Sequence, residues 1–357
     1  MRVTLLGEEV GTPTSGPSRF LINLVAGLRG EGVDVSVAAT SIRPEVDLAF
    51  RRMGVQVAAI RRRPERMIAK AFQLTTRSHV GRDVARLATS QLPADWYVVV
   101  SDAAVDASAL LPPERSVYLS NGDLALMLLS QAFYTSHPMA KSFVARGTSR
   151  LILRNAAFAR QYKVLLANSE FTRGLMSFLY ATPFSGVVYP PVDLNFFRPT
   201  ATEGRSGNYV LAVARNSDEQ GIPILTELAA KVPLHVAGGA SVPGAQNLGV
   251  IPEDALRAEY CGASFLLFPV ASELFGYAVA EALACGTPVM AFRSGGPAEQ
   301  IQDGQTGWLV RTGREAVAQS LSVFREGVPP QMRLAARRSA ERFSIASSAK
   351  ALLSSLV

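Results

Sequence analysis

Residues 272–289 read SELFGYAVAEALACGTPV, and this stretch says more about the fold than any other part of the chain. An alanine-rich helix is predicted after the Phe-Gly turn at 275–276, Gly286 ends it, and Pro288 opens an apolar strand. Short β-branched runs alternate with longer helical patterns along the whole sequence. This alternation is typical of parallel sheets with crossover helices.

The two glutamates of this stretch suit a nucleotide-sugar site. Gly276 leaves the backbone N–H groups at the helix start bare, and the helix dipole favours a phosphate there. Glu281 lies about a turn and a half into the helix, where its carboxylate can accept hydroxyl hydrogen bonds from a ribose. Glu273 precedes the helix and is expected to meet the group attached to the phosphates. Two glutamates at this spacing also occur by chance as solvated side chains.

A chain of 357 residues is longer than a single core usually supports, so two α/β domains are expected. The strand pattern restarts after Pro199, and the polar residues 200–207 are interpreted as the linker. Ligands in doubly wound domains lie at the carboxyl ends of the strands. The strands are expected at Val3–Gly7, Val33–Ala39, Val55–Ile60, Trp96–Ser101, Ser116–Ser120, Val164–Ala167, Gly186–Tyr189, Tyr209–Ala214, Leu234–Ala237, Asn247–Val250, Ser264–Pro269, Pro288–Phe292 and Gly307–Val310.

The spacing of Glu273 and Glu281, with Phe-Gly after the first and Ala-Cys-Gly-Thr-Pro-Val after the second, resembles the E-x7-E signature of retaining GT-B glycosyltransferases of the group 1 (family 4) type. The resemblance implies two Rossmann-like doubly wound domains that face one cleft. It assigns residues 1–198 to an acceptor-side domain and 199–340 to a nucleotide-sugar-binding domain. Residues 341–357 would form a terminal helix packed back on the N-terminal domain.

The same resemblance implies the donor site residue by residue. Arg215 matches a basic residue that holds the donor diphosphate, but Gln220 stands where relatives carry a lysine. Loss of that charge weakens diphosphate binding unless other groups compensate. The remaining donor-binding residues implied are Gly16, Gly238, Val250, Phe275, Gly276, Tyr277 and Glu281.

The implied reaction transfers a hexose-type sugar from UDP or GDP to a hydroxyl acceptor, such as a lipid-linked or cell-surface glycan precursor. Glu273 would orient the sugar and Arg215 would stabilise the diphosphate. Many relatives place a histidine after the strand at 116–120, whereas this chain has Asn121 and Asp123. These two residues either bind sugar hydroxyls or form a plain turn. Glu299 is expected to cap a helix start.

No metal or other cofactor is expected, because the sequence has no Asp-x-Asp triad and its three histidines are scattered. The alternative to an enzyme is a GT-B protein that serves as a non-catalytic scaffold or binding subunit, which Gln220 and the missing histidine favour. A sugar-nucleotide epimerase is disfavoured by the C-terminal pattern.

The net charge of +7 is concentrated between Arg61 and Arg86, where eight basic residues face two acidic ones. A helix through this segment would align its basic residues in one stripe beside an apolar face, namely Arg63, Arg66, Lys70 and Arg77. Either it is a solvated helix, or it binds an anionic membrane surface or acceptor. Nucleic acid is not expected, since no aromatic residues interleave with the arginines.

Composition favours a cytoplasmic protein. The basic helix indicates an alternative, which is a peripheral position on the inner face of the membrane. Apolar residues make up 48% of the chain, yet no apolar run is long enough to span a bilayer. The N-terminal strand is too short for a signal peptide. Cys261 and Cys285 are interpreted as core thiols.

Overall fold

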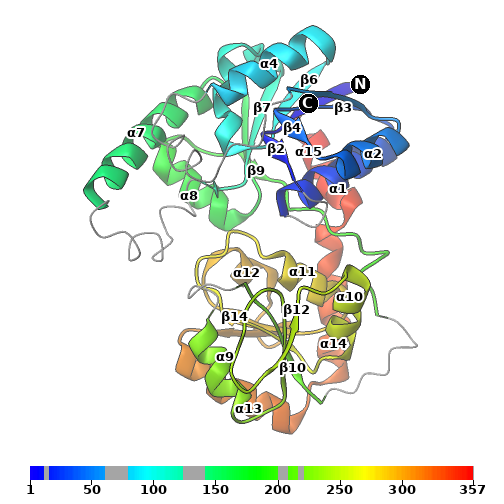
Figure 1. Cartoon of the computed structure of the whole chain (residues 1–357), viewed down its shortest axis with the longest axis vertical. Helices are drawn as coiled ribbons and strands as arrows, with labels where there is room; N and C mark the ends of the chain where they lie inside the picture. Colours follow the sequence, from blue (N-terminus) through cyan, green and yellow to red (C-terminus); the bar gives the residue numbers. More distant parts are fainter. Residues whose placement is uncertain (12–15, 61–78, 124–140, 200–207, 216–220, 357) are drawn as a thin grey trace. The chain divides into compact units, whose positions relative to one another are not determined.

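The computed structural model describes residues 1–11, 16–60, 79–123, 141–199, 208–215 and 221–356. The described chain forms two compact units (Figure 1). The first unit contains the chain up to Pro191 together with Ile345–Val357, and the second contains Val192–Ser344. The chain passes from the first unit to the second after Pro191, which is seven residues before the boundary expected after residue 198.

The first unit is built on a parallel sheet whose strand order is β5-β3-β1-β6-β7-β8-β9. Its strands are short and rich in β-branched residues, which suits a sheet covered on both faces. The order reverses between β1 and β6, so a switch point lies at the middle of the sheet. The strands are β1 (Arg2–Leu6), β3 (Asp34–Ala39), β5 (Gln56–Ala59), β6 (Trp96–Val99), β7 (Ser116–Ser120), β8 (Val164–Ala167) and β9 (Gly186–Val187), and β2 (Glu9–Val10) pairs separately with β4 (Ser41–Ile42).

Two hydrophobic clusters fill the two faces of this sheet. Alternate residues of β1 divide between them: Val3 and Leu5 join one cluster and Leu6 joins the other. The helices that follow the strands supply the remaining apolar side chains. They are α1 (Gly16–Gly30), α2 (Pro44–Arg52), α4 (Val80–Gln91), α7 (Lys141–Ala159) and α8 (Glu170–Tyr180), with 3₁₀ turns at Asp102–Ala109 and Pro113–Arg115.

The last helix, α15 (Ile345–Ser354), completes the first unit. It packs beside α1, as Figure 1 shows, and buries Ala349 and Leu352 in the cluster of Val3 and Leu5. A Cβ on Gly27 would lie 2.7 Å from the carbonyl oxygen of Ile345, so the close helix contact needs glycine there. The Ser348 hydroxyl adds a hydrogen bond to the carbonyl of Tyr189 at 2.7 Å.

The second unit repeats the architecture with a parallel sheet of order β12-β11-β10-β13-β14-β15. Here the order reverses between β10 and β13. The strands are β10 (Val210–Val213), β11 (Leu234–Ala237), β12 (Gln246–Gly249), β13 (Leu266–Phe268), β14 (Val289–Phe292) and β15 (Gly307–Val310). The helices are α9 (Ile222–Ala229), α10 (Glu253–Gly262), α11 (Tyr277–Ala284), α12 (Gly295–Gln300), α13 (Gly313–Glu326) and α14 (Pro330–Ser339), and a 3₁₀ turn spans Ala340–Phe343.

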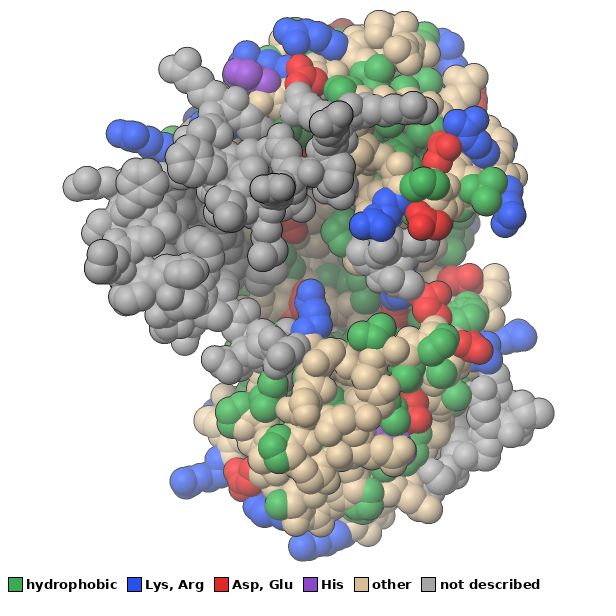
Figure 2. Space-filling view, viewed as in Figure 1, with side chains coloured by type: hydrophobic (Ala, Val, Ile, Leu, Met, Phe, Trp, Pro, Cys, Tyr) green, Lys and Arg blue, Asp and Glu red, His purple; other side chains and the backbone are tan. Residues whose placement is uncertain are grey.

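Every strand expected from the sequence is present, with its ends shifted by at most a few residues. The prediction of two doubly wound α/β domains is therefore confirmed. Among the described helices, none combines the length and apolarity that a membrane crossing requires. On the face drawn in Figure 2, the Lys and Arg side chains of the described residues are scattered, with Asp and Glu among them.

Candidate nucleotide-sugar site

The carboxyl ends of the central strands in the second unit bring Arg215 and Glu273 together. Arg215 follows β10, and Glu273 lies in the loop after β13, the neighbouring strand. Their closest side-chain atoms, Nη2 and Oε2, are 4.0 Å apart. The Arg215 side chain is 80% exposed, so this contact adds little stability. The guanidinium is thus a charge at the surface that a bound diphosphate can recruit.

The loop that carries Glu273 is fixed by its own backbone. The other carboxylate oxygen, Oε1, accepts a hydrogen bond from the N–H of Leu274 at 3.0 Å. The carbonyl of Glu273 accepts a hydrogen bond from the N–H of Gly296 at 2.9 Å. The side chain remains 22% exposed. One carboxylate oxygen is thus held by the loop, while the other faces Arg215.

Helix α11 begins directly after this loop. Its N-cap, Gly276, has φ +86°, a conformation that favours glycine. Phe275 is buried, and its ring packs edge-on against the ring of Tyr277 at 5.5 Å. The glycine cap has no side-chain hydrogen bond. Phosphate binding at this helix N-terminus therefore stays a prediction.

Glu281 lies farther along α11 and is only 2% exposed. A buried carboxylate needs hydrogen-bond donors, and the Tyr260 hydroxyl on α10 supplies one to Oε2 at 3.0 Å. Cys285, one turn later, is also buried, and its thiol is hydrogen-bonded to the Cys261 side chain. That hydrogen bond, followed by desolvation, raises the pKa of Cys285 far above its ordinary value, so the thiol stays protonated.

Gly238 and Val250 lie after β11 and β12. Gly238 has φ +104°, and a Cβ on it would stand 2.3 Å from the carbonyl oxygen of Ala214. Its N–H donates to the carbonyl of Gly249 at 2.8 Å. Val250 is 86% exposed, an unusual state for a valine beside a strand end. Contact of these two residues with a nucleotide base stays a prediction of the resemblance.

In the first unit, the turn after β7 surrounds a buried carboxylate that sequence reasoning missed. Oδ1 of Asp102 accepts hydrogen bonds from the hydroxyls of Tyr118 at 2.9 Å and Ser120 at 2.8 Å. Desolvation, followed by the charge on Asp102, raises the pKa of Tyr118 and keeps its phenol a donor. The backbone N–H of Asn121 adds a third, longer contact at 3.3 Å.

Asn121 and Asp123 lie in the turn that follows β7. The amide nitrogen of Asn121 donates to the carbonyl of Val100 at 2.9 Å, and Gly122 has φ +77°, so the segment is a turn. Asp123 keeps contact with solvent, although protein crowds around its carboxylate. Desolvation by the surrounding protein, followed by repulsion from the carboxylates of Asp102 and Glu8, raises its pKa to about 7.

Two helix starts in the structure have a serine as the N-cap residue. The Ser169 hydroxyl caps α8 by accepting from the N–H of Thr172 at 3.0 Å. Glu299 does not cap a helix start: it lies in the last turn of α12, whose N-cap is Ser294. The Gly-Gly-Pro sequence begins this helix, which shifts Glu299 to its far end.

The structure leaves several predicted residues without a described position. Gly16 is exposed and begins α1, directly after the undescribed residues 12–15. Gln220 falls within 216–220, and the basic stripe of Arg63, Arg66, Lys70 and Arg77 falls within 61–78, both outside the described residues. Among the described residues, no group of His, Cys, Asp and Glu is arranged to hold a metal ion.

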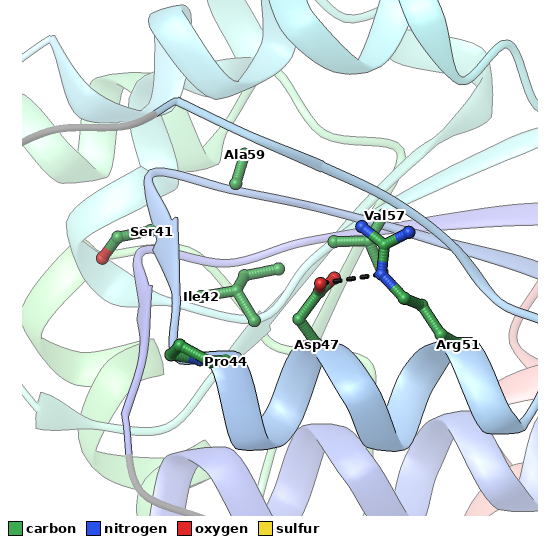
Figure 3. A pocket seen from close by; sticks show the side chains of 7 residues that line it. All are labelled: Ser41, Ile42, Pro44, Asp47, Arg51, Val57 and Ala59. Carbon is green, nitrogen blue, oxygen red and sulfur yellow. Dashed lines mark hydrogen bonds and ion pairs between the residues drawn. The ribbon is translucent and has the colours of Figure 1, made fainter.

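A separate cavity of about 530 Å³ lies in the first unit between α2, β4 and β5 (Figure 3). Its described lining contains one acidic and one basic side chain, Asp47 and Arg51. They pair with each other at 2.8 Å (Figure 3). The cavity therefore offers no unopposed cation for a diphosphate, unlike the strand ends of the second unit.

The glycine pair after β14 supports the Glu273 loop and gives a direct test of it. A Cβ on Gly296 would lie 2.1 Å from the carbonyl oxygen of Leu274. Gly296→Ala is therefore expected to displace the loop and cost about 1–3 kcal/mol of stability, read as a lower melting temperature. Gly239→Ala is the matched control, because a Cβ there meets nothing within 4 Å. Equal melting temperatures for both variants would contradict the packing argument.

Comparison with known proteins finds relatives of the second unit. Residues 209–324 match the family model described as glycosyl transferases group 1. D-inositol 3-phosphate glycosyltransferase of Mycobacterium leprae is 32% identical over 179 residues, covering 42% of this chain and 42% of the relative. The corresponding enzyme of Mycolicibacterium smegmatis is 31% identical over 201 residues, covering 47% and 46%. The match thus spans less than half the length of these curated relatives.

Solved structures extend the likeness to the whole chain. Anabaena HepE in complex with UDP aligns with a TM-score of 0.73 at 17% identity, covering 100% of this chain and 99% of that one. Sucrose-phosphate synthase from Thermosynechococcus elongatus aligns with a TM-score of 0.75 at 14% identity, covering 99% and 98%. The fold is that of the GT-B glycosyltransferases. Residues 209–324, in the second unit, thus resemble the group 1 glycosyltransferases.

Proposed function

We propose that this protein is a retaining glycosyltransferase that binds a UDP-sugar at the strand ends of its second unit. The observation that carries the proposal is the meeting of Arg215 and Glu273 beside the N-terminus of α11, at one edge of one sheet. A cation and a helix N-terminus suit a diphosphate, and a fixed carboxylate beside them suits the sugar attached to it. UDP is favoured over GDP because HepE, which shares the fold, is described in complex with UDP.

In the proposed reaction, the residues of the site position the substrates and stabilise developing charge. The bond from the sugar C1 to the UDP oxygen breaks, and the acceptor oxygen forms a bond to C1 on the same face. The proton of the acceptor hydroxyl passes to the departing phosphate oxygen. Arg215 and the N–H groups of α11 stabilise the charge that develops on the diphosphate. Glu273 holds the sugar, and Glu281 holds the ribose.

Titration calorimetry with UDP, GDP and ADP tests the proposal. We expect the protein to bind UDP, and we expect Glu281→Ala to weaken that binding roughly 10- to 100-fold through loss of charge-assisted hydrogen bonds. Circular dichroism of both proteins shows whether each is folded. Failure of the folded protein to bind any nucleotide would favour the alternative, a non-catalytic binding subunit.

The raised pKa of Asp123 predicts a pH dependence if this residue accepts a hydrogen bond from a sugar hydroxyl. Only the ionised carboxylate accepts without donating, so kcat/KM should rise as the pH increases through about 7. In Asp123→Asn the inflection should disappear, and the rate should stay at the low-pH level. An unchanged pH profile in the variant would remove Asp123 from the site and leave it as a turn residue.

We further propose that the acceptor is a hydroxyl-bearing, lipid-linked glycan precursor presented at an anionic membrane surface. The support is the excess of basic residues between Arg61 and Arg86. Exchanging Arg63, Arg66, Lys70 and Arg77 for Gln should abolish sedimentation with vesicles of anionic phospholipid but leave UDP binding intact. The same exchange of Arg314, Arg325, Arg337 and Arg338 in the second unit is the charge-matched control. Equal sedimentation of both variants would contradict the membrane proposal.

A further inference from the structure

The carboxylate of Glu281 has a dedicated partner on a neighbouring helix. Glu281 is 2% exposed, and the phenol of Tyr260 donates to its Oε2 at 3.0 Å. Tyr260 lies near the end of α10 and is itself fully buried. A neutral phenol that donates to a carboxylate fixes the direction of the carboxylate without cancelling its charge.

Tyr260 is in turn anchored at its backbone and at its ring. Its carbonyl accepts a hydrogen bond from the Thr287 hydroxyl at 2.5 Å, just beyond the end of α11. Its ring packs edge-on against the ring of Phe197 at a centroid distance of 6.2 Å. Because both anchors are buried, the phenol oxygen has little freedom to move. The Glu281 carboxylate is thus hydrogen-bonded to a rigid group.

We infer that Tyr260 is a positioning residue for ribose recognition: it sets the rotation of the Glu281 carboxylate so that a ribonucleotide is preferred over its deoxy analogues. This inference rests on the proposed UDP-sugar function. The terminal torsion of a glutamate is broad, so a carboxylate without a fixed donor samples many orientations. A diol needs two acceptor directions at once, and a preset carboxylate supplies them without an ordering cost.

The experiment compares UDP with 2′-deoxy-UDP and 3′-deoxy-UDP by titration calorimetry. The unaltered protein should bind UDP about 10-fold or more tightly than either deoxy analogue, the effect of one charge-assisted hydrogen bond. Tyr260→Phe should weaken UDP binding about 5- to 30-fold and leave the deoxy analogues nearly unchanged, so that the preference collapses. Glu281→Gln should also lose the preference, and the double variant should bind UDP no more weakly than Glu281→Gln alone.

Tyr209→Phe is the matched control. It also removes one phenol hydroxyl from the second unit, but that hydroxyl donates to the carbonyl of Glu259 at 3.2 Å and not to Glu281. Its ribose preference should equal that of the unaltered protein. A purely structural role for Tyr260 would lower the affinity for all three ligands in the same proportion, and this outcome would overturn the inference.

The proposed function and the role of Tyr260 are contradicted by different results. If the unaltered protein binds neither UDP nor its analogues, the proposed function fails. If Glu281→Gln loses the ribose preference but folded Tyr260→Phe keeps it, only the role of Tyr260 fails. Should Tyr260→Phe not fold, Thr287→Val decides, because it removes the anchor of the Tyr260 carbonyl. A reduced preference in Thr287→Val supports the inference, and an unchanged one overturns it.

Discussion

Glu273→Gln is expected to lower kcat by about 100- to 1,000-fold while UDP binds within about two-fold of its original affinity. The amide oxygen of Gln can still accept from the N–H of Leu274, which holds Oε1 at 3.0 Å, so the loop should keep its shape. What disappears is the charge on the oxygen that faces Arg215 and the sugar. Initial rates with UDP-glucose and calorimetry with UDP separate the two effects.

The control for this variant is Glu227→Gln in the same unit. Glu227 is a surface residue on α9 that pairs with Lys231, just beyond the end of that helix, at 2.8 Å, so its charge should matter little. Its kcat should stay within about two-fold. A loss of UDP binding as large as the loss of kcat in Glu273→Gln would show that Glu273 binds the nucleotide rather than the transferred sugar.

Arg215→Ala is expected to weaken UDP binding by roughly 10- to 100-fold and to lower kcat as well. The side chain is 80% exposed in the absence of a ligand, so its removal should leave the melting temperature nearly unchanged. Because the interaction is between charges at a surface, UDP affinity in the unaltered protein should fall with added salt, and the variant should show a weaker salt dependence.

Arg325→Ala offers a comparison for the charge alone. Arg325 is exposed in the last turn of α13. It does not follow any of the strands whose ends form the site. Its removal changes the net charge equally, yet UDP affinity should stay within about two-fold. Equal losses in both variants would mean that the overall field attracts UDP, with no specific contact from Arg215.

The resemblance to the group 1 glycosyltransferases singled out Arg215 and Glu273, and the strand pattern put each of them after a parallel strand, where strand ends share one edge of a sheet. Each residue follows a short apolar strand, and periodicity alone is enough to place such strands. The turn at Gly276 and the end of α11 are likewise local features, set by glycine and by the alanine-rich run between them. Local sequence patterns were sufficient to place these elements, whereas the roles of Arg215 and Glu273 come from the resemblance.

The partners of the site residues could not be predicted in the same way. Tyr260 donates to a carboxylate 21 residues later, and Asp102 accepts from groups 16 to 19 residues later. Neither pairing follows from helical or strand periodicity, since both depend on how whole elements pack. Asn121 shows the same limit, because its amide is directed to the carbonyl of Val100 on the neighbouring strand's end. Glu299 was misplaced because the helix begins at Gly295, four residues before it.

The return of α15 to the first unit has a consequence for how the chain becomes a folded protein. The second unit is in effect an insertion in the first, whose core is completed only by Ala349, Leu352 and Leu356. On the ribosome, which releases the chain from its N-terminus, the inserted unit has all its strands before the host unit has its last helix. The first half of the polypeptide to be synthesised is therefore the last to reach its final packing, and until then it has an uncovered apolar surface that chaperones can bind.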